Sequence, residues 1–234
     1  MSKKKIIIFT GGSGRFGKVL QSLNLKDKIL FPNKRQFNIL NLTNMNKYIR
    51  KNKAKYLIHA AGLSRPMSIH EKNINKSIEL NIIGTANVAR VCSENKIKLV
   101  YLSTSYVYPG TKGNYNEESS LKPINNYAWS KLGGESAVQM YKNSLILRLS
   151  MTEKPFIHKK AFYNFKTNFM FHIDFARILT KLINKNGIIN VGGKSQSVYD
   201  FAKKHNTKVK KTSYKKNSPS NVTMSLVKLK KIIN

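Results

Sequence analysis

The chain opens on a short apolar run that leads directly into a glycine-rich turn. Residues 6–10 read Ile-Ile-Ile-Phe-Thr, and residues 11–17 read Gly-Gly-Ser-Gly-Arg-Phe-Gly. A continuous apolar run next to glycines is typical of a strand that is buried on both faces of a parallel sheet. Val19, Leu20 and Leu23 then recur at helical spacing. The chain therefore begins with a strand, a tight turn and a helix.

Apolar runs and helical patterns continue to alternate through the first 150 residues. Apolar strands that alternate with helices predict an α/β fold built on a doubly wound parallel sheet. Ligands of such sheets bind at the carboxyl ends of the strands. Further strands are expected at residues 28–31, 56–61, 98–103 and 145–149, and helices at 43–51 (with Thr43 as N-cap), 69–95 and 125–142.

The pattern weakens after Leu149. We therefore expect residues 1–150 to form the ligand-binding domain, and residues 151–234 to interleave the last sheet elements with a small, reduced C-terminal substrate lobe. In this second part we expect an irregular stretch at 151–170, a helix at 174–184 capped by Asp174, a strand at 187–191, a helix at 197–205 and a flexible segment at 206–221.

The glycines of the turn have the spacing of a phosphate-binding loop. Gly12, Gly14 and Gly17 match the pattern G-x-G-x-x-G, and Gly11, Gly14 and Gly17 match its variant G-x-x-G-x-x-G. Residues without a Cβ let backbone N–H groups and the start of a helix approach a pyrophosphate closely. Because the turn directly follows the first strand, it predicts a bound dinucleotide.

The end of the second expected strand indicates which dinucleotide is bound. Folds of this type that prefer NAD usually carry an acidic residue there, which binds the ribose 2′-hydroxyl. Here residues 31–35 read Phe-Pro-Asn-Lys-Arg and hold no carboxylate. Lys34, Arg35 and Arg15 could instead surround a 2′-phosphate. We predict that NADP(H) is preferred and NAD(H) possible; the alternative is that these are three more cations in a basic chain.

Thr104, Tyr127 and Lys131 form the candidate catalytic set. Tyr127 and Lys131 lie four residues apart on an expected helix and so share one face, while Thr104 follows the fourth expected strand. A phenol has a pKa of ~10, and bringing it to roughly 7 takes about 4 kcal/mol, part of which a neighbouring ammonium supplies. A threonine hydroxyl can hold the substrate oxygen. The pattern Y-x-x-x-K alone is unspecific, since Tyr108 and Lys112 also match it.

Together these segments resemble the extended short-chain dehydrogenase/reductase family, and within it the dTDP-4-dehydrorhamnose reductases and related sugar-nucleotide reductases and epimerases. The strongest likeness lies in residues 103–110 and 127–135, with supporting matches at 35–39, 59–62 and 81–85. The resemblance implies a Rossmann-type fold that binds NADP(H) or NAD(H) and takes a nucleotide sugar as its substrate.

Matching positions in the family imply the role of each site residue. Thr104, Tyr127 and Lys131 would be the catalytic residues. The cofactor would contact Gly11, Gly14, Arg15, Phe16 and Gly17 at its pyrophosphate, Arg35 at its 2′-phosphate, Asn38 and Ile39 near its adenine, Ala60, Ala61 and Gly62 along its groove, and Tyr127 and Lys131 near its nicotinamide.

Departures from the family pattern bear on the substrate. Ser105 stands where the rhamnose reductases have Asp, and the Asp-Glu pair of the sugar-nucleotide 4,6-dehydratases is absent there. The part after Ser150 is shorter than a usual nucleotide-sugar lobe. We predict an NADP(H)-dependent reductase, or epimerase-reductase, of a 4-keto-deoxyhexose nucleotide. The alternatives are an NAD(P)-dependent nucleotide-sugar epimerase and a non-catalytic cofactor-binding regulatory or scaffold protein.

Charge and composition limit the partners. A net charge of +33 raises nucleic acid as a partner, but the lysines are scattered along the chain, so a solvated surface is favoured. Cys92 is the only cysteine, and no apolar run reaches the ~18 residues of a membrane span, so we expect a cytoplasmic protein. No metal is expected, because the histidines lack ligand spacing. The family resemblance implies a homodimer paired through residues 69–95 and 125–142.

Overall fold

The computed structural model of the protein describes residues 4–234. These residues form two compact units, each assembled from separated parts of the chain. The first unit contains residues up to 103 together with 126–147 and 183–188, and the second contains 104–125, 148–182 and 189–234.

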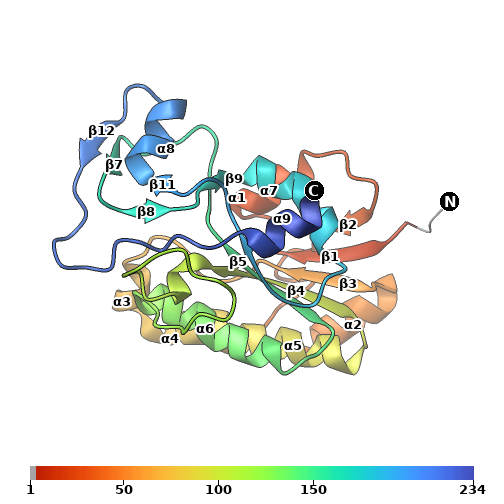
Figure 1. The fold of residues 1–234 in the computed structure, drawn as a ribbon. Helices are drawn as coiled ribbons and strands as arrows, with labels where there is room; N and C mark the ends of the chain where they lie inside the picture. The colour runs from red at the N-terminus through yellow and green to blue at the C-terminus, as the bar shows by residue number, and fades with distance from the viewer. Residues whose placement is uncertain (1–3) are drawn as a thin grey trace. The chain divides into compact units, whose positions relative to one another are not determined.

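Six strands form one parallel sheet, which confirms the predicted doubly wound fold (Figure 1). The strand order is β10-β5-β4-β3-β1-β2. The short pairs β6-β9, β7-β12 and β8-β11 lie outside this sheet. The six strands are β1 (Ile6–Thr10), β2 (Lys28–Leu30), β3 (Tyr56–His59), β4 (Lys98–Thr104), β5 (Ser144–Leu149) and β10 (Gly187–Val191).

The order of the strands reverses at β1, which has β2 on one side and β3 on the other. In the register of the sheet, Ile7 lies between Ile29 of β2 and Tyr56 of β3. Thr10 and His59, the last residues of β1 and β3, are therefore direct neighbours. Such a switch point is where open α/β sheets bind ligands, beyond the carboxyl ends of the strands.

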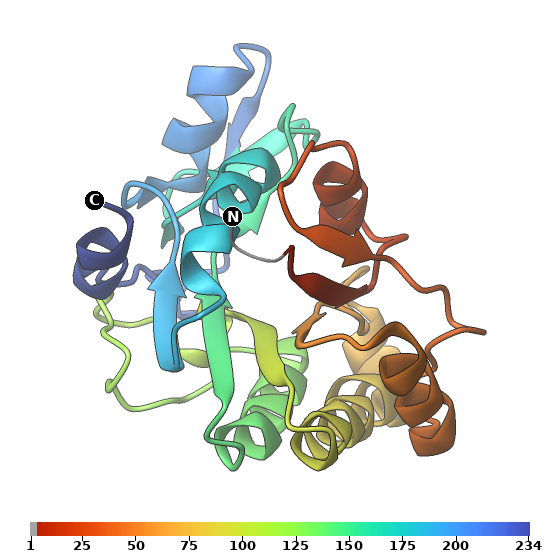
Figure 2. The same ribbon diagram turned by 90° about the vertical axis from the view of Figure 1, so that its right-hand side faces the viewer.

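Helices cover both faces of this part of the sheet. In Figure 2, α1 lies on one face, and α2, α5 and α6 lie side by side on the other. Apolar residues of α2 and α5 pack there against the strands, for example Met45 and Val88 against Leu57 and Leu99, all of which are fully buried. The helices are α1 (Arg15–Gln21), α2 (Leu42–Asn52), α3 (Ile69–Lys72), α4 (Ile74–Ser77), the π-helix η1 (Ile78–Ile83), α5 (Gly84–Glu94) and α6 (Asn126–Gln139).

The single helix predicted at residues 69–95 is wrong in its continuity. Asn73 interrupts it with an extended φ of -141°, and its side chain accepts a hydrogen bond from the backbone N–H of Lys76 to begin α4. Asparagine often breaks helices in this way, because its side chain competes for backbone groups. The N-cap predicted at Thr43 is also wrong: Asn41 caps α2 by accepting from the N–H of Asn44.

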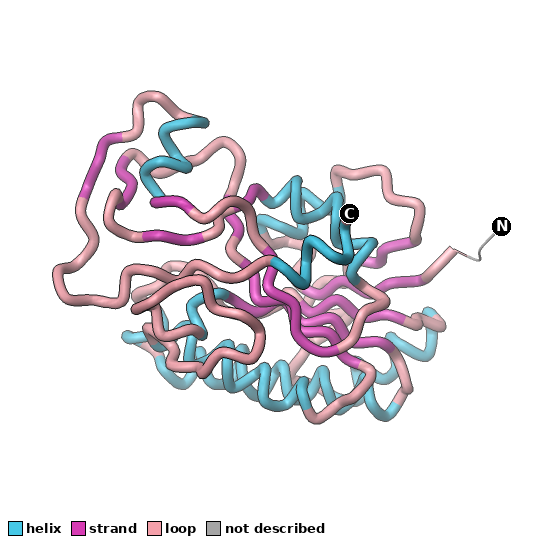
Figure 3. The backbone as a smooth tube through the Cα atoms, viewed as in Figure 1, coloured by secondary structure: helices cyan, strands magenta, loops and turns pink. Residues whose placement is uncertain are grey.

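The second unit has little regular structure, as the long loops of Figure 3 show. Its apolar core contains Phe156, Phe165, Phe171 and Phe201. The segment at 206–221 contains a strand at Lys210–Thr212, and one expectation is corrected: α7 begins at His172, so that Asp174 lies in its first turn. The elements are η2 (Ser105–Val107), β6 (Met151–Thr152), β7 (Lys160–Phe162), β8 (Lys166–Thr167), β9 (Met170–Phe171), α7 (His172–Leu182), β11 (Gln196–Ser197), α8 (Val198–His205), β12 (Lys210–Thr212) and α9 (Val227–Ile233).

None of the helices within residues 4–234 combines the length and the apolar character that crossing a bilayer requires.

Candidate active site

The glycine turn between β1 and α1 is too tightly packed for side chains at two positions. Gly11 has φ +83°, and a Cβ there would lie 2.8 Å from the backbone nitrogen of Ala61. A Cβ on Gly17 would lie 2.5 Å from the carbonyl oxygen of Gly12. The first glycine therefore lets β1 and the β3 loop approach each other, and the last lets α1 pack onto the turn.

Gly14 is the N-cap of α1 and has no side chain to accept hydrogen bonds from the N–H groups of the first helical turn. Its own N–H donates to the carbonyl of Gly11 at 3.0 Å, which closes the turn. Arg15 is exposed, whereas Phe16 is buried with its ring edge on Phe9, 5.8 Å between centroids. A glycine-rich turn that leads into a helix fits a dinucleotide pyrophosphate.

The residues predicted to bind the adenosine end divide into two groups. Lys34 and Arg35 are exposed in the turn after β2, and Asn38 is half-buried. Ile39 is only 8% exposed and packs in the core against Gly84, where a Cβ would lie 2.7 Å from its Cδ1 atom. Arg35 is thus accessible to a ligand, while the Ile39 side chain serves the core.

The loop after β3 is held by two polar side chains. The Thr10 hydroxyl accepts hydrogen bonds from the backbone N–H groups of Ala60 and Ala61, both at 3.2 Å. Gly62 has φ +153°, and a Cβ there would lie 2.6 Å from the Asn81 side-chain oxygen. These contacts fix the backbone of the predicted cofactor groove.

Asn81 was not identified as a site residue from the sequence, although it begins one of the stretches that match the family. It is 1% exposed and lies in the π-helix η1. Its amide exchanges two hydrogen bonds with the backbone of Leu63, at 2.6 and 2.8 Å, and donates a third to the Ser130 hydroxyl. Ser130 in turn donates to the carbonyl of Tyr127 at 2.8 Å. Asn81 therefore ties the loop after β3 to the start of α6.

Tyr127 lies in the first turn of α6 and is half-buried. Its ring centroid is 5.1 Å from that of His70, which is 1% exposed and contacts the Ser77 hydroxyl through Nδ1 at 2.7 Å. Among the described residues, the Nε2 atom of His70 has no hydrogen-bond partner. Burial lowers the pKa of His70, so the ring beside Tyr127 is neutral at neutral pH.

Lys131 is 8% exposed, one turn after Tyr127. Its Nζ atom lies over the ring of Tyr101, 4.1 Å from the centroid. Burial lowers the pKa of Lys131 to about 7, and the charge of Glu135 opposes this shift. Burial, followed by the charge of Glu135, raises the pKa of Tyr101 well above its ordinary value. The structure thus places Lys131, one helical turn after Tyr127, against the ring of a buried phenol.

His59 links the end of β1 to α5. It is fully buried, with Nδ1 2.8 Å from the Thr10 hydroxyl and Nε2 3.1 Å from the Thr85 hydroxyl. Burial lowers its pKa to about 3, and the Lys131 charge adds to this effect. His59 therefore stays neutral and acts as a hydrogen-bonding link.

Thr104 ends β4 and is the first residue of the second unit. It is 7% exposed, and its hydroxyl accepts a hydrogen bond from the N–H of Tyr106 at 3.3 Å. Ser105, which follows, is 1% exposed and begins η2.

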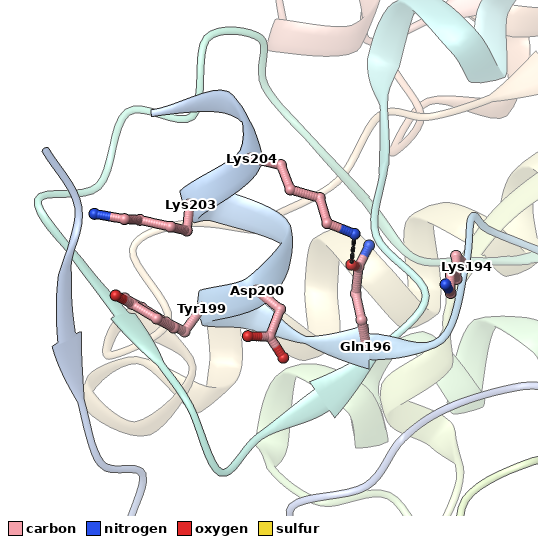
Figure 4. A pocket seen from close by; sticks show the side chains of 6 residues that line it. All are labelled: Lys194, Gln196, Tyr199, Asp200, Lys203 and Lys204. Carbon is pink, nitrogen blue, oxygen red and sulfur yellow. Dashed lines mark hydrogen bonds between the residues drawn. The ribbon is translucent and has the colours of Figure 1, made fainter. Parts of the chain in front are cut away.

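A separate hollow of about 510 Å³ lies on the second unit and contains none of the predicted site residues. Figure 4 shows Lys204 reaching to Gln196, 2.9 Å from Nζ to Oε1, with Asp200 between these residues and Lys203. The Asp200 carboxylate also accepts from the Ser197 hydroxyl at 2.7 Å. The hollow is lined by Lys194, Gln196, Tyr199, Asp200, Lys203 and Lys204.

Residues 4–169 match the protein family described as "RmlD substrate binding domain". In the relatives that match, the likeness is confined to part of the chain. Methionine adenosyltransferase 2 subunit beta from Xenopus laevis is 34% identical over 113 residues, 48% of this chain and 34% of that protein. A dTDP-4-keto-6-deoxy-D-glucose reductase from Streptomyces niveus is 28% identical over 134 residues, 56% of this chain and 46% of that protein. The chain thus matches about a third to a half of the length of these relatives.

The fold as a whole is similar to that of solved reductases. The dTDP-4-dehydrorhamnose reductase from Bacillus anthracis, solved in complex with NADP, superposes with a TM-score of 0.86. The superposition covers 98% of this chain and 92% of that one, at 24% identity. At this identity the likeness establishes the Rossmann-type fold.

Proposed function

Because the chain belongs to the RmlD substrate-binding-domain family, whose match spans residues 4–169, we propose that it is an NADP(H)-dependent reductase or epimerase-reductase. The proposed substrate is a 4-keto-deoxyhexose nucleotide, as the name of the Streptomyces niveus relative suggests. The observation that carries the proposal is the buried Lys131 ammonium beside Tyr101, one helical turn after Tyr127.

In the proposed reaction, Tyr127 donates its phenolic proton to the oxygen of the substrate carbonyl as that oxygen becomes an alkoxide. A bound dihydronicotinamide would supply the hydride. The Lys131 ammonium stabilises the phenolate that remains, because an opposite charge nearby lowers the pKa of an acid. The Thr104 hydroxyl would accept or donate a hydrogen bond at the same substrate oxygen and hold it in place.

The glycine turn and the groove after β3 would hold the cofactor, with the backbone of Gly11, Gly14 and Gly17 at the pyrophosphate. Arg35 supports a preference for NADP(H), because it is exposed in the turn after β2, where no carboxylate is present. Ala60 and Ala61 would line the groove, since their N–H groups are held by Thr10.

A homodimer is the second part of the proposal. Large apolar side chains are exposed along α4, η1 and α6 of the first unit, among them Ile74, Ile83 and Trp129, at 52%, 49% and 54%. Exposed apolar patches of this kind are typical of protein interfaces. These helices lie within residues 69–95 and 125–142, through which the family resemblance implies that the homodimer pairs.

A non-catalytic role is the alternative that one observation favours. The Xenopus laevis relative is named as a subunit beta, which implies a partner subunit. A regulatory protein of this kind would keep the cofactor turn without using Tyr127. An epimerase would use the same residues but return the hydride to the sugar, so it would not consume NADPH.

The variant Tyr127→Phe tests the proposal. It removes the proton donor but keeps the ring against His70, so we expect turnover of 4-keto-deoxyhexose nucleotides to fall by about 1,000-fold. NADPH should bind with nearly unchanged affinity. A rate equal to that of the unmodified protein would exclude the mechanism, and NADPH binding without turnover of any nucleotide sugar would favour the regulatory alternative.

A further inference from the structure

Two charged side chains lie in the middle of the buried face of α6. Ala128, Lys131, Glu135 and Val138 recur at helical spacing along this face, with exposed fractions of 0, 8, 0 and 0%. An amphipathic helix normally places apolar residues at such positions. Burying a single charge is costly, whereas burying two opposite charges one helical turn apart is less so. The burial of Glu135 is therefore best explained by the positive charge of Lys131 on the same face.

Glu135 is directed toward the sheet. Its carboxylate accepts a hydrogen bond from the Ser103 hydroxyl on β4 at 2.5 Å, and Ser103 is itself buried. The helix lies close to β4 at this point, since a Cβ on Gly134 would lie 2.6 Å from the Tyr101 hydroxyl. Tyr101 also donates to the backbone carbonyl of Lys131 at 3.3 Å.

Two titratable groups of the sheet near Lys131, His59 and Tyr101, carry no negative charge at neutral pH. From β3, His59 is kept neutral by burial and by Lys131 itself. From β4, Tyr101 stays protonated because burial and Glu135 raise its pKa well above 10.0. Tyr127 lies one turn before Lys131 on α6. The Glu135 carboxylate is therefore the counter-charge that the fold provides for the Lys131 ammonium.

We infer that Glu135 is a positioning residue whose buried carboxylate, one helical turn after Lys131, keeps Lys131 charged beside the Tyr101 ring. The inference rests on the proposed function, in which a charged Lys131 supports the phenol of Tyr127. Ser103 fixes the carboxylate, and the close approach at Gly134 sets the distance between helix and sheet.

The physical consequence follows from burial. Burial alone lowers the pKa of Lys131, and Glu135 is the group that raises it back toward about 7. Without that carboxylate, a larger fraction of Lys131 is a neutral amine at neutral pH. A neutral amine cannot stabilise a phenolate by charge.

The test compares Glu135→Gln, which keeps the size and the hydrogen bond from Ser103, with Glu135→Asp, which keeps the charge. Titration of lysine labelled with an isotope at Cε reports the charge of Lys131 by NMR without any turnover, and Lys131→Arg identifies its signal. We expect the Lys131 titration to move down by about one pH unit or more in Glu135→Gln and by less in Glu135→Asp. Lys98, whose pKa burial lowers to about 8, lies on β4, the strand that carries Ser103, and should titrate unchanged.

Ser103→Ala separates charge from hydrogen bonding, because it leaves the carboxylate in place. A Lys131 titration that is unchanged in Glu135→Gln overturns the inference, and so does a shift in Ser103→Ala as large as that in Glu135→Gln. If Glu135→Gln does not fold, Glu135→Asp decides alone. Because Glu135→Asp retains the charge, a shift of its Lys131 titration beyond one pH unit also overturns the inference.

Turnover provides the second measurement. The alkaline limb of kcat against pH should move to lower pH in Glu135→Gln, so that the rate falls about tenfold more at pH 8 than at pH 6. A purely structural loss would lower kcat equally at both values and overturn the inference. If the protein turns over no nucleotide sugar, the proposed function fails, while the NMR titration still decides whether Glu135 sets the charge of Lys131.

Discussion

The ammonium of Lys131 lies over the ring of Tyr101, with Nζ 4.1 Å from the ring centroid. The face of an aromatic ring attracts a cation by about 0.5–2 kcal/mol. This attraction partly replaces the water that Lys131 loses on burial. It also places Tyr101, which no sequence motif marks, at the centre of the candidate active site.

Removing the Tyr101 ring should lower the affinity of Lys131 for its proton. In Tyr101→Leu we expect the alkaline limb of kcat against pH to move down by roughly 0.5–1 pH unit, as the loss of a cation–π contact predicts. Tyr101→Phe is the matched control, because it keeps the ring and loses only the hydroxyl that donates to the Lys131 carbonyl. Equal shifts in the two variants would show that the ring face has no effect.

The stability of the protein should fall in acid because His59 is buried as a neutral ring. Its pKa is about 3 in the folded state against an ordinary value of 6.5, so the unfolded chain binds more protons between these limits. The free energy of unfolding should therefore decrease by up to about 1.4 kcal/mol per pH unit as pH falls through this window. Urea unfolding at several pH values measures the slope, which should be shallower in His59→Gln.

The stability should also rise with pH on the alkaline side because of Lys131. Its folded pKa of about 7 lies below the ordinary 10.5, so the unfolded chain again binds more protons in between. In Lys131→Met, the free energy of unfolding should lose the part of this rise that the titration of one lysine contributes. The comparison needs urea unfolding at pH 7 and pH 9, and equal slopes for the two proteins would show that Lys131 is charged in the folded state up to pH 9.

Alanine at Gly17 should disrupt the cofactor turn. The added Cβ would lie 2.5 Å from the Gly12 carbonyl oxygen, so α1 must move away from the turn. We expect the dissociation constant for NADPH to rise by about tenfold or more, which corresponds to about 1.4 kcal/mol. Ser13→Ala, in the same turn at an exposed position that already has a Cβ, is the control and should bind NADPH normally.

Arg35 should set the preference for NADPH. Arg35→Asp should weaken NADPH binding by about tenfold and leave NADH binding equal or stronger, because an acidic residue there suits the ribose 2′-hydroxyl. Arg50→Asp is the matched control, since it makes the same charge change at an exposed position of α2. If both variants weaken NADPH binding equally, the effect belongs to the overall charge of +33 rather than to a 2′-phosphate site.

The local sequence determined the fold class and the existence of most elements. Apolar runs such as residues 6–10 and 98–103 predict strands by themselves, because a strand buried on both faces needs apolar residues at nearly every position. The glycine spacing likewise follows from local backbone sterics, as Gly11 and Gly17 show. The break of the helix at Asn73 could not be predicted in this way, because the residues around it have ordinary helical spacing.

Only the tertiary structure decided which polar groups surround Lys131. Tyr101, His59 and Glu135 come from β4, β3 and α6, and each lies in a stretch that reads from the sequence as plain strand or helix. Their effect arises because the parallel sheet and α6 bury them together, and burial is what changes their pKa values. Neighbours along the chain determine whether a strand or a helix forms, but removal from water depends on contacts between distant segments, which no local pattern contains.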